Sequence, residues 1–278
     1  MPDEAHESIL RFERVSLAFE SVPALRNVCF SVNAGETRII LGAAGSGKSV
    51  LLKVAAGLLR PDAGEVYLFG QEITRLEEEV LFDIRGKVGI LFQEGGLFDS
   101  LTIEENVAYP LLNQRVRVGK APVNREQTAE KVRDALRFVE LEHTLEKVPS
   151  ELSGGMRRRV GIARAAVTEP PLTLYDSPTA GLDPITANTI MALIAKARDT
   201  KNTTSVIVTH RYQDGHIMAN FRYNPESGQL EPAPRESGIH ERTTFMVLQE
   251  GKLVFEGNQE ELERAQDPYV SKFKGPRR

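Results

Sequence analysis

The chain has 278 residues, of which 41% are hydrophobic and 27% charged, and its formal net charge is −4 at pH 7. This mix is typical of a soluble globular protein with one large domain or two small ones, and it excludes disordered and collagen-like chains. The acidic balance argues against nucleic acid as a partner, because proteins that neutralise phosphates are usually basic.

Cysteine content and apolar runs exclude further classes. The single Cys29 rules out an internal disulfide framework and a cysteine-built zinc site, as expected in a reducing cytosol. The longest apolar runs, such as residues 88–92, are far shorter than the ~20 residues of a membrane-spanning helix, so work at a membrane would need partners or surface contact. Residues 1–4 are acidic and precede no apolar run, which predicts that no secretory signal is present.

The first 60 residues predict short strands followed by one helix. Apolar residues over 12–19 nearly alternate, and a turn is expected at 33–35. A short apolar strand at 38–41 runs directly into a glycine-rich segment, residues 42–49. Leucines at helical spacing follow, and this helix is predicted to end at Arg60–Pro61.

The middle of the chain alternates between helices and buried strands. Thr102 and Glu105 have the spacing of a capping box, and residues 126–141 predict an amphipathic helix. The apolar runs 172–175 and 205–208 do not alternate, which is typical of buried parallel strands. Between them, Asp183 is a good N-cap with proline at the first helical position.

One stretch breaks the composition. Residues 222–242 are polar and rich in proline and glycine, which predicts an inserted surface loop or a loose hairpin. Loops of this length are usually functional or mobile. No internal repeat is visible in the chain.

Residues 42–49 match G-x-x-x-x-G-K-S between a strand and a helix, the context that a phosphate-binding P-loop requires. Backbone N–H groups and the helix N-terminus would hold the phosphates, with Lys48 at the β- and γ-phosphates and Ser49 at Mg²⁺. Compared with a chance glycine-rich turn, this is strongly favoured. The predicted nucleotide-binding residues are Gly42, Ala43, Ala44, Gly45, Ser46, Gly47, Lys48, Ser49 and Val50.

Asp176 ends the apolar run 172–175. In P-loop proteins such an aspartate holds Mg²⁺ beside the P-loop hydroxyl. A strand-end aspartate that only begins a turn is the alternative, and the neighbouring P-loop motif favours the metal role.

Leu152-Ser153-Gly154-Gly155-Met156, followed by a predicted helix from Arg157 to Val167, resembles the signature motif of ABC-transporter ATPases. Gln93 is similar to the Q-loop glutamine, residues 180–183 to the D-loop, His210 to the switch histidine and Phe19 to the aromatic residue that stacks on adenine. The motifs have the family's order and spacing, and the resemblance covers roughly residues 9–260. The bland alternative for His210 is a core histidine.

The resemblance implies an α/β fold: a P-loop NTPase ABC cassette with a RecA-like parallel-sheet core, an antiparallel β subdomain and a helical signature subdomain. A single ATPase domain is expected over 9–260, with the helical subdomain at about 94–168, the polar insertion at about 222–242 and a short C-terminal tail at 261–278. The triple arginine at 157–159 is predicted to be a solvated helix face and not a nucleic-acid patch.

Ser153 and its glycines would form a second anion site at a helix N-terminus. The resemblance implies that they complete the nucleotide site of a second copy, in a head-to-tail dimer with two ATP molecules between Lys48 of one subunit and Ser153 of the other. The resemblance also implies further nucleotide contacts at Phe19, Ser153, Gly154, Gly155 and Asp183. The expected metal ligands are Ser49, Gln93 and Asp176. The expected catalytic residues are Ser177, His210, Gln93 and Asp176.

Residues 88–111, 149–156, 183–186 and 267–273 are similar to the ATPases of Mla/MCE phospholipid transporters. This implies an integral-membrane permease, an MCE-type lipid-binding subunit and a peripheral position on the cytoplasmic face of the inner membrane. Five apolar residues would help to line a groove for a permease helix, although each could also be core: Leu97, Phe98, Leu101, Val107 and Tyr109.

Ser177 occupies the position where these ATPases normally carry the glutamate that polarises water. A hydroxyl cannot accept a proton near pH 7 as a carboxylate does, although it can orient water. Glu94 is a possible substitute, but a solvent-facing loop residue is the better interpretation. Arg211 also departs from the pattern, because an acidic residue often follows the histidine.

Three functions therefore remain in view. The first is the ATP-hydrolysing motor of a membrane lipid transporter, with the ATPase of a non-lipid ABC importer or exporter as an alternative. The second, which Ser177 favours, is an ATP-gated dimerisation module with little hydrolysis. The third, a repair or translation ABC protein, is disfavoured because those tend to carry tandem cassettes or long insertions.

Overall fold

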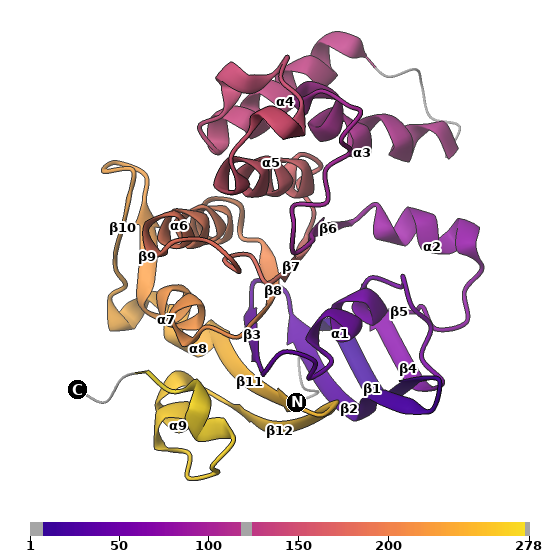
Figure 1. Ribbon diagram of the computed structural model, residues 1–278, viewed down its shortest axis with the longest axis vertical. Helices are drawn as coiled ribbons and strands as arrows, with labels where there is room; N and C mark the ends of the chain where they lie inside the picture. The colour runs from indigo at the N-terminus through magenta and orange to yellow at the C-terminus, as the bar shows by residue number, and fades with distance from the viewer. Residues whose placement is uncertain (1–7, 118–123, 276–278) are drawn as a thin grey trace, which may run out of the picture.

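The structure is a computed structural model that describes residues 8–117 and 124–275 (Figure 1). A six-stranded sheet lies at its centre in the order β12-β11-β3-β8-β7-β6. Five strands are parallel, and β12 pairs antiparallel with β11. The bounds are β3 (Thr37–Leu41), β6 (Val88–Leu91), β7 (Leu172–Asp176), β8 (Thr204–Thr209), β11 (Thr243–Gln249) and β12 (Lys252–Gly257).

The inner strands β3, β7 and β8 are buried on both faces, as the non-alternating apolar runs predict. Neighbouring residues of β3 belong to different cores, since Ile39 and Leu41 pack on one face and Ile40 on the other. This follows from the two-residue period of a strand. The parallel-sheet core expected from the sequence is confirmed.

A second, antiparallel sheet covers one of these faces, with the helix α1 packed into the same core. Its strand order is β2-β1-β4-β5. The elements are β1 (Ser8–Phe19), β2 (Val22–Asn33), β4 (Ala63–Leu68), β5 (Gln71–Glu72) and α1 (Lys48–Ala55). The helix α1 is shorter than the predicted one, because Gly57 takes a left-handed φ of 65° two residues after Ala55 and turns the chain.

A group of helices joins the parallel sheet at its β6–β7 end, drawn at the top of Figure 1. These are α3 (Ile103–Arg117), α4 (Arg125–Phe138) and α5 (Gly154–Ala166), with short 3-10 turns at Glu142–Thr144 and Pro149–Glu151. The helix α2 (Glu78–Arg85) lies before β6. The capping box is confirmed, since the Thr102 N–H donates to Glu105 and the Glu105 N–H donates to the Thr102 hydroxyl.

The helix α5 begins at Gly154, three residues before the predicted start at Arg157. The reason is its cap: the Ser153 hydroxyl accepts a hydrogen bond from the Met156 N–H at 3.2 Å. The helix predicted over 126–141 runs instead over Arg125–Phe138, capped by Asn124. The predicted cap Asp183 does begin α6 (Pro184–Lys201).

The polar insertion contains the predicted hairpin, formed by β9 (Phe221–Asn224) and β10 (Gln229–Pro232). Its second half is not a loose loop, because a 3-10 turn at Arg235–Ser237 leads into α8 (Ile239–Arg242). Ile239 is buried there, and its carbonyl accepts a hydrogen bond from the Thr243 hydroxyl. This contact anchors the insertion to β11.

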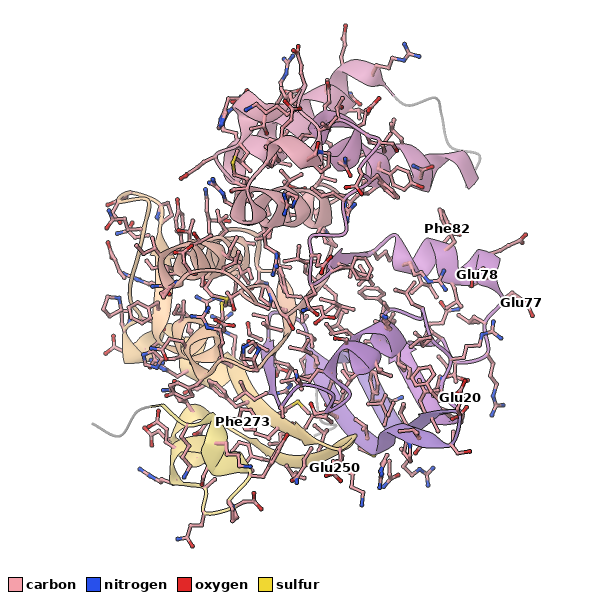
Figure 2. The ribbon with its side chains drawn as sticks, in the orientation of Figure 1. Glu20, Glu77, Glu78, Phe82, Glu250 and Phe273 are labelled. Atoms are coloured by element: carbon pink, nitrogen blue, oxygen red, sulfur yellow. The ribbon has the colours of Figure 1, made fainter. Side chains whose placement is uncertain are left out.

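Two further helices, α7 (Tyr212–Asn220) and α9 (Gln259–Arg264), and a 3-10 turn at Val270–Phe273 complete the described chain. Leu262, Val270 and Phe273 belong to the same core as α6 and the parallel sheet; Phe273 is labelled in Figure 2. The domain limits expected at residues 9–260 stay a prediction. No helix of the described ranges is long and apolar enough to cross a membrane.

Candidate functional site

Four of the predicted nucleotide-binding elements gather at one edge of the parallel sheet, where its parallel strands end. Leu41 pairs with Thr209, Asp176 with Val208, and Leu91 with Tyr175, so four adjacent strands end at nearly the same level. The P-loop, Ser177, His210 and Gln93 each follow one of these strand ends. Ligands of open α/β sheets bind at this carboxyl edge.

The P-loop curls at glycines that no other residue could replace without strain. Gly47 has a φ of 103°, and a Cβ there would lie 2.4 Å from the carbonyl oxygen of Ala24. Gly47 is also the N-cap of α1 and, having no side chain, supplies no capping oxygen. The first N–H groups of α1 therefore have no capping oxygen, which leaves a helix N-terminus suited to an anion.

Lys48 is buried among the other residues of the P-loop. Its ammonium donates hydrogen bonds to the carbonyl oxygens of Gly42 at 2.8 Å and Ala43 at 2.7 Å. Burial lowers the pKa of Lys48, and the nearby negative charge of Asp176 partly opposes this effect. The charge of Asp176 acts on Lys48, so the end of β7 lies near the P-loop.

Asp176 and Ser177 are hydrogen-bonded to each other at the end of β7. The Ser177 hydroxyl donates to the Asp176 carboxylate at 3.0 Å, and the Ser177 N–H donates to the carbonyl of Val208. Ser177 has a left-handed φ of 49°. Its hydroxyl is therefore already oriented by the aspartate.

The chemistry of the predicted metal ligands suits Mg²⁺. Asp176, Ser49 and Gln93 offer carboxylate, hydroxyl and amide oxygens, the hard donors that Mg²⁺ takes alongside substrate phosphates. Within the described ranges no three His, Cys, Asp or Glu residues cluster as a metal site. Because the predicted donor set holds a single carboxylate, most ligands of a bound Mg²⁺ would come from phosphate and water.

Three predicted contact residues are exposed. Phe19 ends β1 with 47% of its surface accessible, and Gln93 and His210 follow β6 and β8. Glu94 is exposed as well, as the sequence indicated, and its negative charge acts on Arg158. These side chains are exposed and therefore accessible to a ligand.

The signature segment lies on a different surface from the P-loop. Ser153, Gly154 and Gly155 line a hollow of about 660 Å³ together with Gly181 and Asp183, and no P-loop residue lines it. A Cβ on Gly155 would lie 2.6 Å from the Thr186 side chain, so α5 and α6 begin in direct contact. The structure brings the signature and the D-loop together in a hollow that no P-loop residue lines.

Asp183, which lines this hollow, is the N-cap of α6. Its carboxylate accepts hydrogen bonds from the N–H groups of Ile185 and Thr186, each at 3.0 Å. The hydrogen bond from the Thr186 side chain lowers the pKa of Asp183, followed by the backbone bonds. An anionic cap at this helix start agrees with the helix dipole.

The predicted solvated face at 157–159 is wrong for Arg158. This side chain is buried, and it donates hydrogen bonds to the carbonyls of Ser177, Pro178 and Ala180. Burial lowers the pKa of Arg158, with the charges of Glu94 and Asp176 opposing. Arg158 therefore connects α5 to the loop that follows β7.

A second buried arginine of α5 holds the segment after Gln93. Arg164 donates to the carbonyls of Gly96 at 2.8 Å and Gly95 at 3.0 Å. Burial lowers the pKa of Arg164. One helix thus contacts both the Q-loop and the D-loop, a connection that the sequence motifs did not indicate.

Asp214 explains the unusual Arg211. Its buried carboxylate accepts hydrogen bonds from Thr179 at 2.6 Å and Thr209 at 2.7 Å, and Arg211 lies 3.8 Å away. Position 211 thus lacks the acidic residue that is often found there. Asp214, one helical turn later, pairs with Arg211 and connects it to Thr179 in the loop after β7. In the sequence, His210 lies between Thr209 and Arg211.

The C-terminal segment also reaches the P-loop. The Tyr269 hydroxyl accepts a hydrogen bond from the Ala43 N–H at 3.1 Å and donates to the carbonyl of Leu248 at 3.3 Å. The neighbouring Val270 and Phe273 are buried in the core. Tyr269 was not predicted as a site residue, because only the fold brings it to the loop.

The predicted permease groove divides into two parts. Val107 is fully buried in the core, so it cannot line a surface groove. Phe98 and Tyr109 are each 41% exposed, with ring centroids 4.6 Å apart. The buried Asn106 side chain binds both the N–H and the carbonyl of Phe98, which fixes this exposed aromatic pair.

Sequence comparisons place this geometry among known proteins. Residues 25–180 match the family model described as ABC transporter. The methionine import ATP-binding protein MetN of Carboxydothermus hydrogenoformans is 43% identical over 68% of this chain and 54% of its own length. The chain thus spans little more than half of such relatives. The intermembrane phospholipid transport system ATP-binding protein MlaF of Haemophilus influenzae is 32% identical over 89% of this chain and 83% of its own length.

Solved structures are similar over almost the whole chain. A dimeric ATP-binding cassette in a post-hydrolysis state bound to ADP and Pi has a TM-score of 0.74 at 29% identity, covering 90% of this chain and 98% of that chain. A nucleotide-free cassette from an ABC transporter has a TM-score of 0.73 at 28% identity and covers 97% and 100%.

Proposed function

The chain belongs to the ABC transporter family of ATP-binding proteins, and from this premise we propose that it binds and hydrolyses ATP as the motor of a membrane transporter. The observation that carries the proposal is the sheet edge where the P-loop, Asp176, Gln93 and His210 follow adjacent parallel strands. Phosphoryl transfer depends mainly on such positioning and on charge stabilisation.

In this proposal the triphosphate enters the P-loop at the N-terminus of α1. The Lys48 ammonium exchanges its hydrogen bonds to the carbonyls of Gly42 and Ala43 for bonds to phosphate oxygens. A phosphate dianion beside the buried ammonium would also raise the pKa of Lys48, which opposes the lowering caused by burial. Phe19, exposed at the end of β1, is proposed to stack on adenine.

Mg²⁺ is proposed to bind through Ser49, Gln93 and Asp176, where it would neutralise charge developing on the phosphates. The role of Asp176 is twofold, since it also accepts the Ser177 hydroxyl bond. His210 is proposed to contact the γ-phosphate from the end of β8.

The second half of the site is proposed to come from another copy of the chain. Ser153, Gly154, Gly155 and Asp183 line an open hollow that contains no P-loop residue. The helix N-terminus of α5 suits a phosphate. A head-to-tail dimer would set this hollow of one subunit against the P-loop of the other.

Ser177 favours slow turnover. General-base assistance contributes about 10²–10⁴-fold in rate, and a hydroxyl does not supply it. The second candidate function therefore follows from this residue: an ATP-gated dimerisation module with little hydrolysis. Single-turnover hydrolysis distinguishes this module from a fast motor.

Phospholipid is the proposed cargo class, with a permease and an MCE-type subunit as partners at the cytoplasmic face of the inner membrane. The share of each relative's length that aligns with this chain supports this cargo class. The alignment covers 83% of the phospholipid-system protein but 54% of the methionine-import protein. Identity favours methionine import instead, at 43% against 32%. A non-lipid importer is thus the competing cargo assignment.

The aromatic pair Phe98–Tyr109 is proposed as the contact for a permease helix, because an exposed apolar pair can receive the apolar face of an amphipathic helix. Purification of the complex in mild detergent, with mass spectrometry of bound subunits and lipids, tests this assignment. We expect a permease, an MCE-type subunit and phospholipid. Recovery of a complex free of lipid that retains methionine would contradict the cargo.

In the same experiment Phe98→Glu should lose the permease, because burying an unpaired charge costs about 2–5 kcal/mol. Val80→Glu is the matched control, since Val80 is similarly exposed, at 42%, on α2. Nucleotide binding should be unchanged in both variants. Normal assembly of the Phe98→Glu variant with the permease would show that this surface is not the permease contact.

A further inference from the structure

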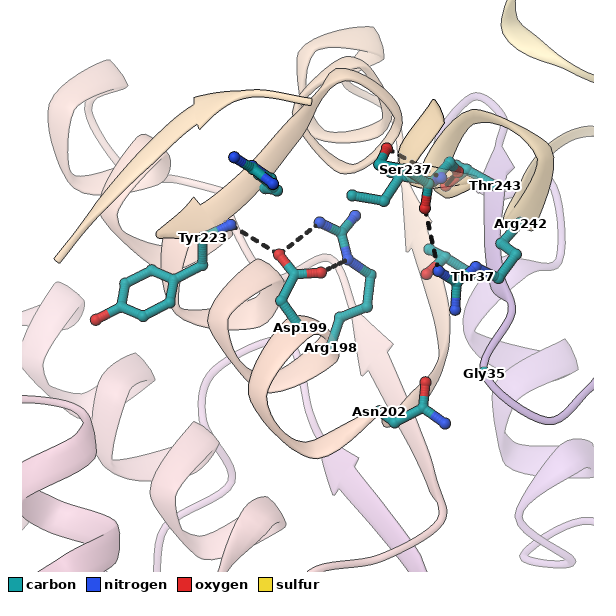
Figure 3. A pocket seen from close by; sticks show the side chains of 11 residues that line it. Gly35, Thr37, Arg198, Asp199, Asn202, Tyr223, Ser237, Arg242 and Thr243 are labelled. Atoms are coloured by element: carbon teal, nitrogen blue, oxygen red, sulfur yellow. Dashed lines mark hydrogen bonds and ion pairs between the residues drawn. The ribbon is translucent and has the colours of Figure 1, made fainter. Parts of the chain in front are cut away.

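A second cavity, of about 260 Å³, lies at the end of the parallel sheet where β3 begins (Figure 3). Thr37, at the first position of β3, lines it, whereas the P-loop follows the last residue of β3. The end of α6 and the polar insertion form its other walls. This cavity is therefore separate from the proposed ATP site, and it is built in part by the segment 222–242.

The floor of the cavity carries a polar group without a partner. Thr37 is 1% exposed, and its hydroxyl oxygen has no hydrogen bond in the described part of the chain. The neighbouring Thr243 does not satisfy it, because that hydroxyl donates to the carbonyl of Ile239. A buried hydroxyl left unpaired is costly, so a partner from a bound molecule would stabilise it.

The inner pair of charges is already engaged. Arg198 is buried, and its guanidinium forms an ion pair with Asp199 and donates to the carbonyls of Met218 and Phe221. Asp199 also accepts the Tyr223 N–H at 2.7 Å (Figure 3). Asp199 is the one carboxylate among the described residues that line the cavity. Arg198 balances its negative charge.

Two other arginines of the lining have no carboxylate partner. Arg222 and Arg242 make no ion pair with any residue of the described ranges, and Arg242 donates one hydrogen bond, to the carbonyl of Ser237 at 3.3 Å. The cavity lining therefore has two positive charges beyond the balanced pair. The basic residues in the last turn of α6, Arg198 and Lys201, offset the negative end of that helix.

We propose that this cavity binds the phosphate group of a small phosphomonoester. The two unpaired guanidinium groups match the charge of a dianion, and arginine is suited to phosphate recognition. Thr37 supplies a hydroxyl donor from the floor. The volume leaves room for a small organic group beside the phosphate.

The test titrates inorganic phosphate, glycerol 3-phosphate and acetate into the full chain saturated with Mg²⁺ and a non-hydrolysable ATP analogue, so that the P-loop is filled. Calorimetry should detect phosphate and glycerol 3-phosphate but not acetate. The double variant Arg222→Gln/Arg242→Gln should bind both phosphates at least about tenfold more weakly, because charge-assisted hydrogen bonds are lost. Arg125→Gln, at an exposed position of α4, is the matched control and should bind as the parent does.

Thr37→Val gives an independent readout. Without phosphate this variant should melt no lower than the parent, because it removes an unpaired buried hydroxyl. With phosphate its rise in melting temperature should be smaller than that of the parent. Absence of phosphate binding in the analogue-saturated parent, equal binding by the double variant, or acetate binding as tightly as phosphate would each overturn the proposal.

Discussion

The P-loop edge and the signature hollow each contain the N-terminus of a helix, but the polar groups around these N-termini are arranged differently. At the P-loop edge, Lys48 is surrounded by its own loop carbonyls, and Asp176 and Ser177 are hydrogen-bonded to each other. At the hollow, Ser153 and Asp183 cap their own helices and face outwards beside three glycines. The first region thus makes its polar contacts within its own loop and strand end, whereas the second exposes its capping residues at the surface.

This difference shows how the two regions can be separated by mutation. Changes at the sheet edge should act within a single copy of the chain. Changes at the hollow should act only when two copies meet. Changes at Arg158, which connects α5 to the loop after β7, should affect both.

The largest effect is expected at the P-loop. Lys48→Ala should lower nucleotide affinity or turnover by about 10²–10³-fold, since it removes a preorganised charge aimed at the phosphates. Equilibrium binding of a fluorescent ATP analogue and steady-state hydrolysis measure this. Lys53→Ala, one turn later on an exposed face of α1, is the matched control. Equal loss in both variants would point to damage to the helix and not to the site.

Ser177→Glu should raise the single-turnover rate by up to about 10²-fold, because it introduces a proton acceptor beside Asp176. The left-handed backbone at 177 is no obstacle, since Glu20, Glu140 and Glu250 adopt similar φ values in this chain. Ser177→Ala is the paired variant and should slow hydrolysis only if the hydroxyl orients water. A fast parent that Ser177→Glu slows would assign the base to another group, with Glu94 and His210 tested next.

Arg158→Met should destabilise the chain by about 1–3 kcal/mol, because carbonyls that the guanidinium satisfies lose their donor. Urea unfolding measures this change. Arg159→Met is the matched control and should cost less, since Arg159 is half-buried and donates to one carbonyl, that of Val139. Equal midpoints for the two variants would show that the bridge from α5 to the D-loop contributes nothing.

The sequence predicted the parts of the site that lie within short segments. The P-loop, the strand-end Asp176 and the caps at Thr102 and Asp183 are local patterns, so residue types and spacing suffice to find them. The parallel order of the strands then brings these segments to one edge. The antiparallel sheet and the helical signature region followed from the family resemblance.

The connections between segments could not be predicted in this way. Tyr269 meets Ala43 across 226 positions, and Asp214 meets Thr179 across 35. Arg158 looked like a surface arginine because it lies in a basic run, and only the path of the chain after β7 buries it. The cavity at Thr37 depends on an insertion whose sequence predicted little beyond a hairpin.

The central claim is that the P-loop of one copy and the signature of another form one site, and mixing two variants tests it most directly. In Lys48→Ala the P-loop half is defective; in Ser153→Arg the signature half is blocked while monomeric nucleotide binding stays near normal. Light scattering with Mg²⁺ and ATP should show each variant alone as a monomer. Their mixture should recover dimers, because the pair contains one intact composite site. A mixture that remains monomeric, or Ser153→Arg dimers as stable as those of the parent, would contradict the claim.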